Sequence, residues 1–293
     1  MNNDKNKYYM KVLVTGASSY IGKYIISNLL INGHSVLSTS RKNPKINHKF
    51  HKWIKHDLSK KIFKVGLFKP DLVVHLAGYA WMGDKSEKYI NSNILTTINL
   101  VKSLKKKKIK KFFYLSTRDV YGKIQEKKLE ENTKINNPDI YGHSKLIAEK
   151  ILQESFPVII LRLPSIIGLG THGWIKSLVN RLKKNQNISM INSKFNNFMH
   201  ASEISKIILK LFKSKIRSDI FLVSCSDIIN SIDVVKKLRF KLKSKSKIML
   251  KKNKEYSYII SSKKLNRIYK TLTVKKVIEI YLNEIKSKNK YIY

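Results

Sequence analysis

The sequence predicts an α/β fold, a doubly wound parallel sheet with a smaller lobe towards the C-terminus. Two observations carry this prediction. Short apolar runs alternate with longer segments whose apolar residues recur at helical spacing, which is typical of repeated βα units. The first apolar run is followed directly by a turn of small residues and then by a helical pattern. Since crossovers between parallel strands are right-handed, these units build a sheet with helices on both faces.

The first unit, residues 11–22, organises the rest of the chain. Residues 12–14 are apolar and predict a buried strand, and the helical pattern begins at Tyr20. The first N–H groups of a helix have no partner inside the helix, and the helix dipole favours negative charge there. The turn therefore suits an anionic pyrophosphate, although a purely structural strand–helix turn has the same pattern.

Glycines in this turn fit the binding hypothesis. Gly16 lets the turn close, and Gly22 lets the helix pack on the strand and keeps a side chain away from a ligand. Ser19 stands where a middle glycine is usual in such turns, and it is small enough to let the backbone approach.

The second strand, residues 35–40, ends at Ser40-Arg41-Lys42. An acidic residue at this place would bind the ribose hydroxyls of NAD, whereas hydroxyl and cationic groups suit a 2′-phosphate. We therefore expect NADP in preference to NAD, with a solvated basic turn as the alternative. Asp57, after the third strand, is placed either to bind an adenine amino group or to cap the next turn.

The remaining segments continue the alternation of strands and helices. The expected strands lie at 52–55, 71–78, 111–117 and 156–164, and the expected helices at 88–107, 138–155 and 174–182. The helix at 174–182 is amphipathic, so we expect it to face the core, with a wall of the substrate site as the alternative. Small residues at the end of the 71–78 strand leave room for a ligand.

Tyr141 and Lys145 are four residues apart on a segment with helical periodicity, so they share one face. A nearby ammonium group stabilises phenolate and lowers the pKa of a tyrosine below its usual value near ~10. Such a tyrosine can carry a proton to or from a substrate oxygen, and Thr117 at the end of the 111–117 strand can bind the same oxygen. Alone, such a pair is usually part of a solvated helix face.

Composition limits the other possibilities. The formal net charge is +41, which in principle favours a nucleic-acid or membrane binder. The lysines are scattered along the whole chain without a nucleic-acid motif, so we expect no nucleic-acid function. No run of apolar residues is long enough to span a bilayer, so we expect no membrane span. Cys225 is the single cysteine, which excludes an internal disulfide and a cysteine zinc cluster. Residues 1–9 lack the apolar core of an export signal and are expected to form a loose tail, and a single cysteine suits a reducing compartment. We therefore expect a cytoplasmic location.

Taken together, the motifs resemble a known family. They occur in its order and spacing at 15–22, 56–58, 75–78, 93–97 and 115–122, followed by Tyr141-x-x-x-Lys145. The chain is thereby identified as a member of the extended short-chain dehydrogenases, the NAD-dependent epimerase/dehydratase family, which acts largely on nucleotide sugars. Segments 195–200, 221–224 and 261–290 extend the resemblance over nearly the whole chain.

The resemblance implies a Rossmann-type domain at 10–165 plus 199–224 and a substrate-binding lobe at 166–198 plus 225–293. It implies that Tyr141 is the acid/base, that Lys145 holds the nicotinamide ribose and lowers the pKa of Tyr141, and that Thr117 orients the substrate carbonyl. The cofactor-binding residues that it implies are Gly16, Ser19, Tyr20, Ile21, Gly22, Ser40, Arg41, Asp57, Leu58, Leu76, Ala77, Asn93, Tyr141 and Lys145. No metal site is implied.

Three positions depart from the family pattern. Arg118 stands where the dehydratases have an acidic proton donor, which disfavours 4,6-dehydration. Asn196 replaces an arginine that contacts the substrate phosphate in many epimerases, and Ser165 stands near the place of a substrate-binding asparagine. A 4-keto reductase of nucleotide sugars therefore fits at least as well as a 4-epimerase.

The leading hypothesis is an NAD(P)-dependent oxidoreductase or epimerase of a nucleotide-activated sugar in surface polysaccharide synthesis, the pathway resting on analogy alone. The family often pairs through two helices per subunit, so we expect a homodimer through 88–107 and 138–155. The alternative is a non-catalytic NADP-binding regulator whose basic surface contacts nucleic acid.

Overall fold

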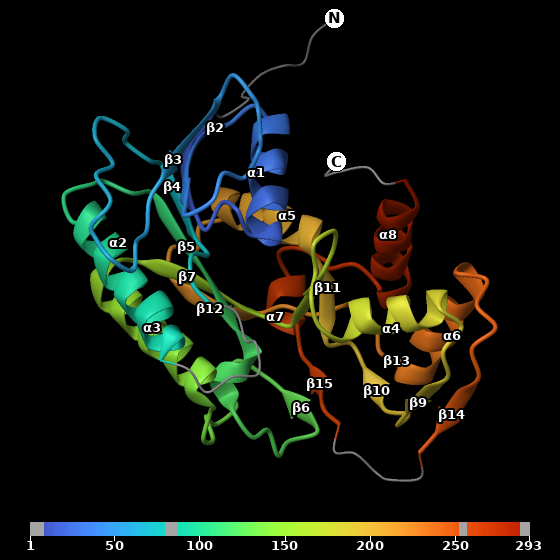
Figure 1. The fold of residues 1–293 in the computed structure, drawn as a ribbon. Helices are drawn as coiled ribbons and strands as arrows, with labels where there is room; N and C mark the ends of the chain where they lie inside the picture. The colour runs from blue at the N-terminus through green and yellow to red at the C-terminus, as the bar shows by residue number, and fades with distance from the viewer. Residues whose placement is uncertain (1–8, 80–86, 252–256, 288–293) are drawn as a thin grey trace, which may run out of the picture.

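Seven parallel strands form the central sheet of the protein, a computed structural model that describes residues 9–79, 87–251 and 257–287 (Figure 1). The strands are β1 (Lys11–Thr15), β2 (Ser35–Ser40), β3 (His51–Lys55), β4 (Leu72–His75), β5 (Lys111–Thr117), β7 (Val158–Leu163) and β12 (Asp219–Leu222). Their order across the sheet is β12-β7-β5-β4-β1-β2-β3, and every neighbouring pair is parallel. The order reverses at β1, next to β4, and this switch point is where open α/β sheets bind ligands. The doubly wound fold predicted from the sequence is confirmed.

Helices cover both faces of the sheet (Figure 1). On one face α1 (Tyr20–Ile31) packs against α5 (Ala201–Lys213), and on the other α2 (Thr96–Leu104) packs against α3 (Ile140–Ser155). Separate buried apolar clusters lie under the two layers. Since both faces are covered, the inner strands are apolar without alternation, as in the fully buried β5.

Local capping fixes where the helices nearest the cleft begin. The Ser19 hydroxyl accepts a hydrogen bond from the Gly22 N–H at the start of α1. The Asp139 carboxylate accepts one from the Gly142 N–H, at 2.7 Å, at the start of α3. A short 3₁₀ turn, η2 (Arg118–Tyr121), begins where the Thr117 hydroxyl accepts from the Asp119 N–H. These caps satisfy N–H groups that a helix leaves open at its first turn.

A smaller group of elements lies beside the sheet (Figure 1). It contains α4 (Trp174–Lys183), β9 (Ile188–Met190), β10 (Lys194–Phe195), β13 (Ile229–Asn230), α6 (Ser231–Lys241), β14 (Ile248–Leu250) and α8 (Val274–Ser287). Between it and the sheet lie β8 (Ser165–Ile167), which pairs with β11 (Phe198–His200), and β6 (Lys128–Leu129), which pairs with β15 (Ile259–Ile260), together with α7 (Lys263–Asn266). Residues 201–222 return to the main sheet as α5 and β12.

The expected elements differ from the observed ones mainly at their ends. The helix expected at 88–107 is a π-helical turn, η1 (Ile90–Leu95), continued by α2 and ending at Leu104. The strand expected at 71–78 ends at His75, so the small residues that follow it form a loop. Of the tail expected at 1–9, residues 1–8 lie outside the described part of the chain. Among the described helices, none is both long enough and apolar enough to cross a membrane.

Candidate active site

Two adjoining hollows lie along the carboxyl-terminal edge of the sheet. The larger has a volume of about 710 Å³ and the smaller about 260 Å³. Ser19, Leu76 and Gly78 line both, so the hollows form one cleft over the ends of β1 and β4. This is the edge at which parallel α/β sheets bind ligands.

The turn after β1 is closed by glycines that no other residue could replace without displacement. Gly16 has φ of +75°, and a Cβ there would lie 2.8 Å from the Ala77 N atom. A Cβ on Gly22 would lie 2.6 Å from the Gly16 carbonyl oxygen. The sequence-based explanation for both glycines therefore has a steric basis in the structure. The Ser19 hydroxyl, in the middle-glycine position, is used as the cap of α1 and also donates to the Gly16 carbonyl at 2.8 Å.

The remaining residues expected in this turn form the start of α1. Tyr20 and Ile21 both line the larger hollow. The Tyr20 hydroxyl donates to the Ile166 carbonyl at 2.9 Å, and burial raises the pKa of Tyr20 to about 12. Tyr20 thus links the turn to the strand that leads into the smaller lobe.

The smaller hollow contains the residues expected to face an adenosine. Ser40, Arg41, Asp57, Leu58 and Ala77 all line it. The Ser40 hydroxyl already donates to the Lys42 carbonyl at 2.7 Å and accepts from the Trp53 indole at 3.0 Å. Its hydrogen is therefore committed, and Arg41 is the exposed cation that can meet a phosphate here.

Asp57 is held as a carboxylate at the same end of the cleft. Partial burial alone would raise its pKa, but hydrogen bonds from Ser59 and the positive charges of Arg41 and Lys60 lower it below its usual value. The Asp57 carboxylate accepts from the Ser59 N–H at 3.0 Å and from the Ser59 hydroxyl at 2.6 Å. Asp57 thus caps the following turn, one of the two roles that the sequence left open, while still lining the hollow.

The larger hollow brings together Thr117 from β5, Tyr141 and Lys145 from α3, and Asn93 from η1. Asn93 is buried, donates to the Ser144 hydroxyl at 2.9 Å and accepts from the Tyr79 N–H at 2.8 Å. Its side chain thereby ties the π-helical turn to α3. Interruptions of this kind are frequent at functional sites.

Tyr141 differs from the sequence-based expectation in the direction of its pKa. Burial and the negative charge of Asp119 raise the pKa of Tyr141 well above its ordinary value, while a hydrogen bond from Thr117 acts in the opposite sense. The expected lowering by Lys145 is wrong for this structure, because Lys145 is not among the groups that shift the pKa of Tyr141. Burial disfavours phenolate, and the charge with the largest effect is that of an anion.

Lys145 is directed into the protein beside the cleft. Its ammonium donates to the Leu115 carbonyl at 2.7 Å and lies 4.1 Å from the centre of the Tyr114 ring. Burial lowers the pKa of Lys145 to about 7, and Glu149 partly offsets this effect. At neutral pH the side chain is therefore poised between its charged and neutral forms.

A buried ion pair beneath Lys145 was not anticipated. Arg162 on β7 donates to Glu149 on α3 at 2.7 Å and 3.2 Å, and the Ser116 hydroxyl donates to the same carboxylate. Both charged side chains are at most 5 % exposed. One sequence signal could have revealed the pair: Arg162 is a lone charge inside the apolar run of β7, and such a charge needs a buried partner.

Part of the lining of the larger hollow comes from the start of α4. Leu178, Val179 and Leu182 are buried, as the core-facing prediction requires, but Trp174 is 41 % exposed and lines the larger hollow. The Trp174 ring meets the Phe195 ring edge-on, with centroids 5.5 Å apart. The core-facing prediction is therefore confirmed for the three buried residues, and the substrate-wall alternative stays a prediction for Trp174.

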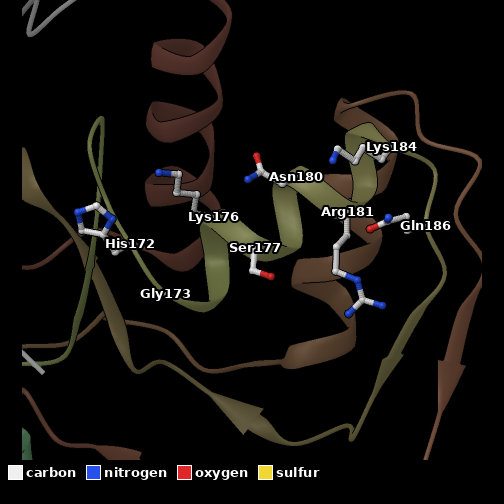
Figure 2. A pocket seen from close by; sticks show the side chains of 8 residues that line it. All are labelled: His172, Gly173, Lys176, Ser177, Asn180, Arg181, Lys184 and Gln186. Atoms are coloured by element: carbon white, nitrogen blue, oxygen red, sulfur yellow. The ribbon is translucent and has the colours of Figure 1, made fainter. Parts of the chain in front are cut away.

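A third hollow of about 330 Å³ runs along α4 (Figure 2). Its lining residues are His172, Gly173, Lys176, Ser177, Asn180, Arg181, Lys184 and Gln186. Figure 2 shows Lys176 and Asn180 on one side of the helix and Ser177 and Arg181 on the other. Because these side chains do not converge on one point, the hollow lacks the arrangement of a binding site.

The structure shows the surroundings of two of the residues that depart from the family pattern. Ser165 lines the larger hollow, as expected for a substrate contact. Asn196 is buried and bonds β15: it donates to the Ile260 carbonyl at 2.8 Å and accepts from the Ile260 N–H at 2.9 Å. The Asn196 side chain therefore holds the backbone of β15. In the described ranges, no group of three or more His, Cys, Asp or Glu side chains could bind a metal ion.

A sequence profile of the NAD dependent epimerase/dehydratase family matches residues 12–223. The chain belongs to this family of enzymes. A dTDP-D-glucose 4,6-dehydratase from Dictyostelium discoideum is 28 % identical over 278 residues, a match that covers 81 % of this chain and 63 % of that protein. A UDP-glucose 4-epimerase from Pisum sativum is 28 % identical over 189 residues, covering 56 % of this chain and 54 % of that protein.

The matches thus span between about half and two-thirds of the length of these relatives. Among solved structures, a UDP-glucuronic acid 4-epimerase from Bacillus cereus in complex with NAD superposes with a TM-score of 0.81 at 19 % identity, covering 96 % of this chain and 100 % of that one. At this identity the likeness establishes the fold, and it confirms the predicted Rossmann-type architecture.

Proposed function

We propose that this member of the family catalyses an NAD(P)-dependent reduction or epimerisation at a carbonyl or hydroxyl carbon of a nucleotide-activated sugar. The observation that carries the proposal is the convergence of Thr117, Tyr141 and Lys145 in the larger hollow, directly beside the glycine turn. The relatives named as UDP-glucose 4-epimerase and dTDP-D-glucose 4,6-dehydratase support a nucleotide sugar as the substrate class. A role in surface polysaccharide synthesis extends the proposal by analogy.

The cleft fits a dinucleotide in shape and in chemistry. The glycine turn leaves no room for side chains between α1 and the loop after β4, so backbone N–H groups can approach a pyrophosphate. Arg41 and Asp57 lie at the adenosine end, and Lys145 and Asn93 at the opposite end. A bound nicotinamide would accept or supply hydride there.

The chain's own residues then handle the proton. Tyr141 lies at the end of the cleft with its phenol protonated, so it can donate a proton to a carbonyl oxygen as that carbonyl is reduced. Lys145 can bind a ribose hydroxyl from the same side. Trp174 and Ser165 flank the space where the sugar would lie.

NADP preference and dimer formation belong to the same proposal. Arg41 is the group that supports a 2′-phosphate, since the Ser40 hydroxyl hydrogen is already used. Three apolar side chains support pairing through the face of η1 and α3, within the expected helices 88–107 and 138–155: Ile90, Leu95 and Ile147 are 44 %, 39 % and 44 % exposed. Sedimentation of the purified chain would measure the pairing, and a monomer at micromolar concentration would contradict it.

The decisive experiment compares the wild-type chain with Tyr141→Phe. The wild type would be incubated with NADP⁺ or NAD⁺ and each of UDP-glucose, UDP-glucuronic acid and dTDP-glucose, and with the corresponding 4-keto sugars and NADPH. We expect turnover in the wild type and a loss of at least ~100-fold in the variant, with cofactor affinity retained. Equal turnover in both proteins would overturn the proposal. Cofactor binding without turnover in either protein, together with salt-sensitive RNA binding, would favour the regulatory alternative.

A further inference from the structure

Residues 168–173, the segment that joins β8 to α4, form part of the wall beside the place proposed for the sugar. His172 and Gly173 line the larger hollow together with Trp174, the first residue of α4, and Figure 2 shows the first two directly before that helix. Three of the six residues in this segment are glycine. Because glycine loses more conformational freedom on folding than any other residue, such a segment needs specific contacts to keep one conformation.

Two tyrosines of α1 hold this segment and the strand before it. The Tyr24 hydroxyl accepts a hydrogen bond from the Leu169 N–H at 2.8 Å. One helical turn earlier, the Tyr20 hydroxyl donates to the Ile166 carbonyl at 2.9 Å. The segment lies so close to α1 that a Cβ on Gly168 would be 2.9 Å from the Tyr24 hydroxyl oxygen. The wall of the larger hollow is therefore attached to the helix that begins at the glycine turn.

The Tyr24 hydroxyl is in turn oriented by Glu284 of α8. It donates its hydrogen to the Glu284 carboxylate at 2.7 Å, so its oxygen is left to accept from the Leu169 N–H. The same carboxylate oxygen accepts from the His200 Nε2–H at 3.1 Å, because His200 Nδ1 already accepts from the Ser202 N–H. Tyr24 and His200 are fully buried, and the Glu284 side chain is 13 % exposed. These bonds form a directed series inside the protein, from the segment to α1 and from α1 to α8.

We propose that Tyr24 and Glu284 are positioning residues for the sugar side of the cleft. The hydrogen bonds from Leu169 to Tyr24 and from Tyr24 to Glu284 fix residues 168–173 on α1, and with them the place of Trp174 in the wall. This inference rests on the proposed function and deepens it, because it names two residues away from the larger hollow that set how tightly the sugar is held. The sugar wall and the turn proposed for the pyrophosphate then keep a fixed spacing, since both are attached to α1.

A purely structural role for the Tyr24 hydroxyl would give a different pattern of effects. Any Tyr→Phe change that removes a bonded hydroxyl from the interior leaves its partner unpaired and lowers stability. Tyr269 offers the matched control, because its hydroxyl donates to the Glu203 carboxylate, also at 2.7 Å, and its side chain lines neither part of the cleft. Tyr269→Phe should therefore lower stability without changing the place of the segment.

The first test follows Trp174 and needs no substrate. The chain has three tryptophans, so protein labelled with 5-fluorotryptophan gives three ¹⁹F NMR signals, and Trp174→Phe identifies that of Trp174. We expect Tyr24→Phe to shift this signal and Tyr269→Phe to leave it in place. Glu284→Gln, whose amide oxygen can still accept from Tyr24, should shift the signal less than Glu284→Ala. An unmoved Trp174 signal in Tyr24→Phe and Glu284→Ala would overturn the proposal.

The second test separates positioning from chemistry by steady-state kinetics. Its probe is whichever of UDP-glucose, UDP-glucuronic acid, dTDP-glucose and their 4-keto forms the wild type turns over. Tyr24→Phe should raise KM for this probe at least about fivefold and leave kcat within about twofold, because a displaced wall weakens binding of the sugar in the ground state and the transition state alike. Tyr269→Phe should leave both constants unchanged.

Two kinetic results would overturn the positioning role: an unchanged KM in Tyr24→Phe, or an equal rise of KM in Tyr269→Phe. Gly168→Ala serves if Tyr24→Phe does not fold, since its Cβ would displace the segment from the Tyr24 hydroxyl and should raise KM in the same way. A wild type that turns over none of the probes would contradict the proposed function alone, because the fluorine signal of Trp174 still decides whether Tyr24 and Glu284 position the wall.

Discussion

At the adenosine end of the cleft, Arg41 is exposed and Asp57 is a half-buried carboxylate whose pKa lies below its usual value. At the opposite end, Lys145 and Tyr141 are enclosed by protein, and burial is the first cause of the shift in each pKa. Water screens the first pair, so its side chains can select a ligand at little cost to the fold. The second pair lies in a low dielectric, so each charge there affects folding and protonation together. Ligand discrimination and proton chemistry are thus separated along one cleft.

The largest effect expected from this difference is at the ion pair beneath the catalytic end. Glu149→Gln leaves Arg162 buried without an anionic partner, and breaking such a pair costs about 3–5 kcal/mol. Urea denaturation would measure the loss in the free energy of unfolding. Glu154→Gln removes the same charge from an exposed site of the same helix and should change stability by less than ~0.5 kcal/mol. Equal losses in the two variants would contradict the expectation that charges buried at the catalytic end affect folding more than exposed charges do.

A second effect, which depends on pH, is expected for Lys145→Met. The pKa of Lys145 is about 7 in the folded chain, against ~10.5 when unfolded. Between these values the unfolded chain binds the extra proton, so this residue makes wild-type stability rise with pH by up to ~1.4 kcal/mol per unit. The methionine variant lacks this contribution, so it should be the more stable protein near neutral pH, with the gap closing as pH rises. Urea melts at several pH values would check this, and parallel curves for the two proteins would contradict it.

The variant Arg41→Ala tests the exposed, adenosine end of the cleft. Its folding stability should stay within ~0.5 kcal/mol of wild type, because the side chain is exposed. Its Kd for NADPH should rise about tenfold, equivalent to ~1.4 kcal/mol, with little change for NADH, since only NADPH carries the 2′-phosphate. Fluorescence titration with both cofactors measures this. Lys42→Ala is the neighbouring control, and an equal loss for NADH and NADPH in Arg41→Ala would exclude a role in phosphate recognition.

The sequence predicted much of the framework because its signals are local. Apolar runs placed the strands at 35–40 and 111–117 as the structure has them, and the glycine spacing placed the turn between β1 and α1. The family assignment was confirmed by a match of the family profile over residues 12–223. Apart from Gly22, the residues expected along the cleft do line it, while their roles as ligands of a cofactor or substrate stay predictions.

The sequence-based expectations were wrong or incomplete where burial and contacts between distant segments determine the structure. A helical spacing of four put Tyr141 and Lys145 on one face, but it could not show that the Lys145 ammonium is bonded to Leu115 in a neighbouring strand. The π-helical turn at η1 broke a helix whose periodicity looked continuous. The lone charge of Arg162 in its apolar run indicates a buried partner, but the pairing joins a strand to a helix, and no local pattern identifies that partner as Glu149.

The sequence by itself determined the order of strands and helices, the glycine turn and the family, because these follow from periodicity and from steric limits on single residues. Only the tertiary structure decided the protonation of the candidate site. The pKa values of Tyr141 and Lys145 depend on desolvation and on charges brought close by folding, and the capture of the Thr117 hydrogen by Asp119 depends on the geometry of η2. Those quantities are properties of a three-dimensional environment, which a residue pattern does not contain.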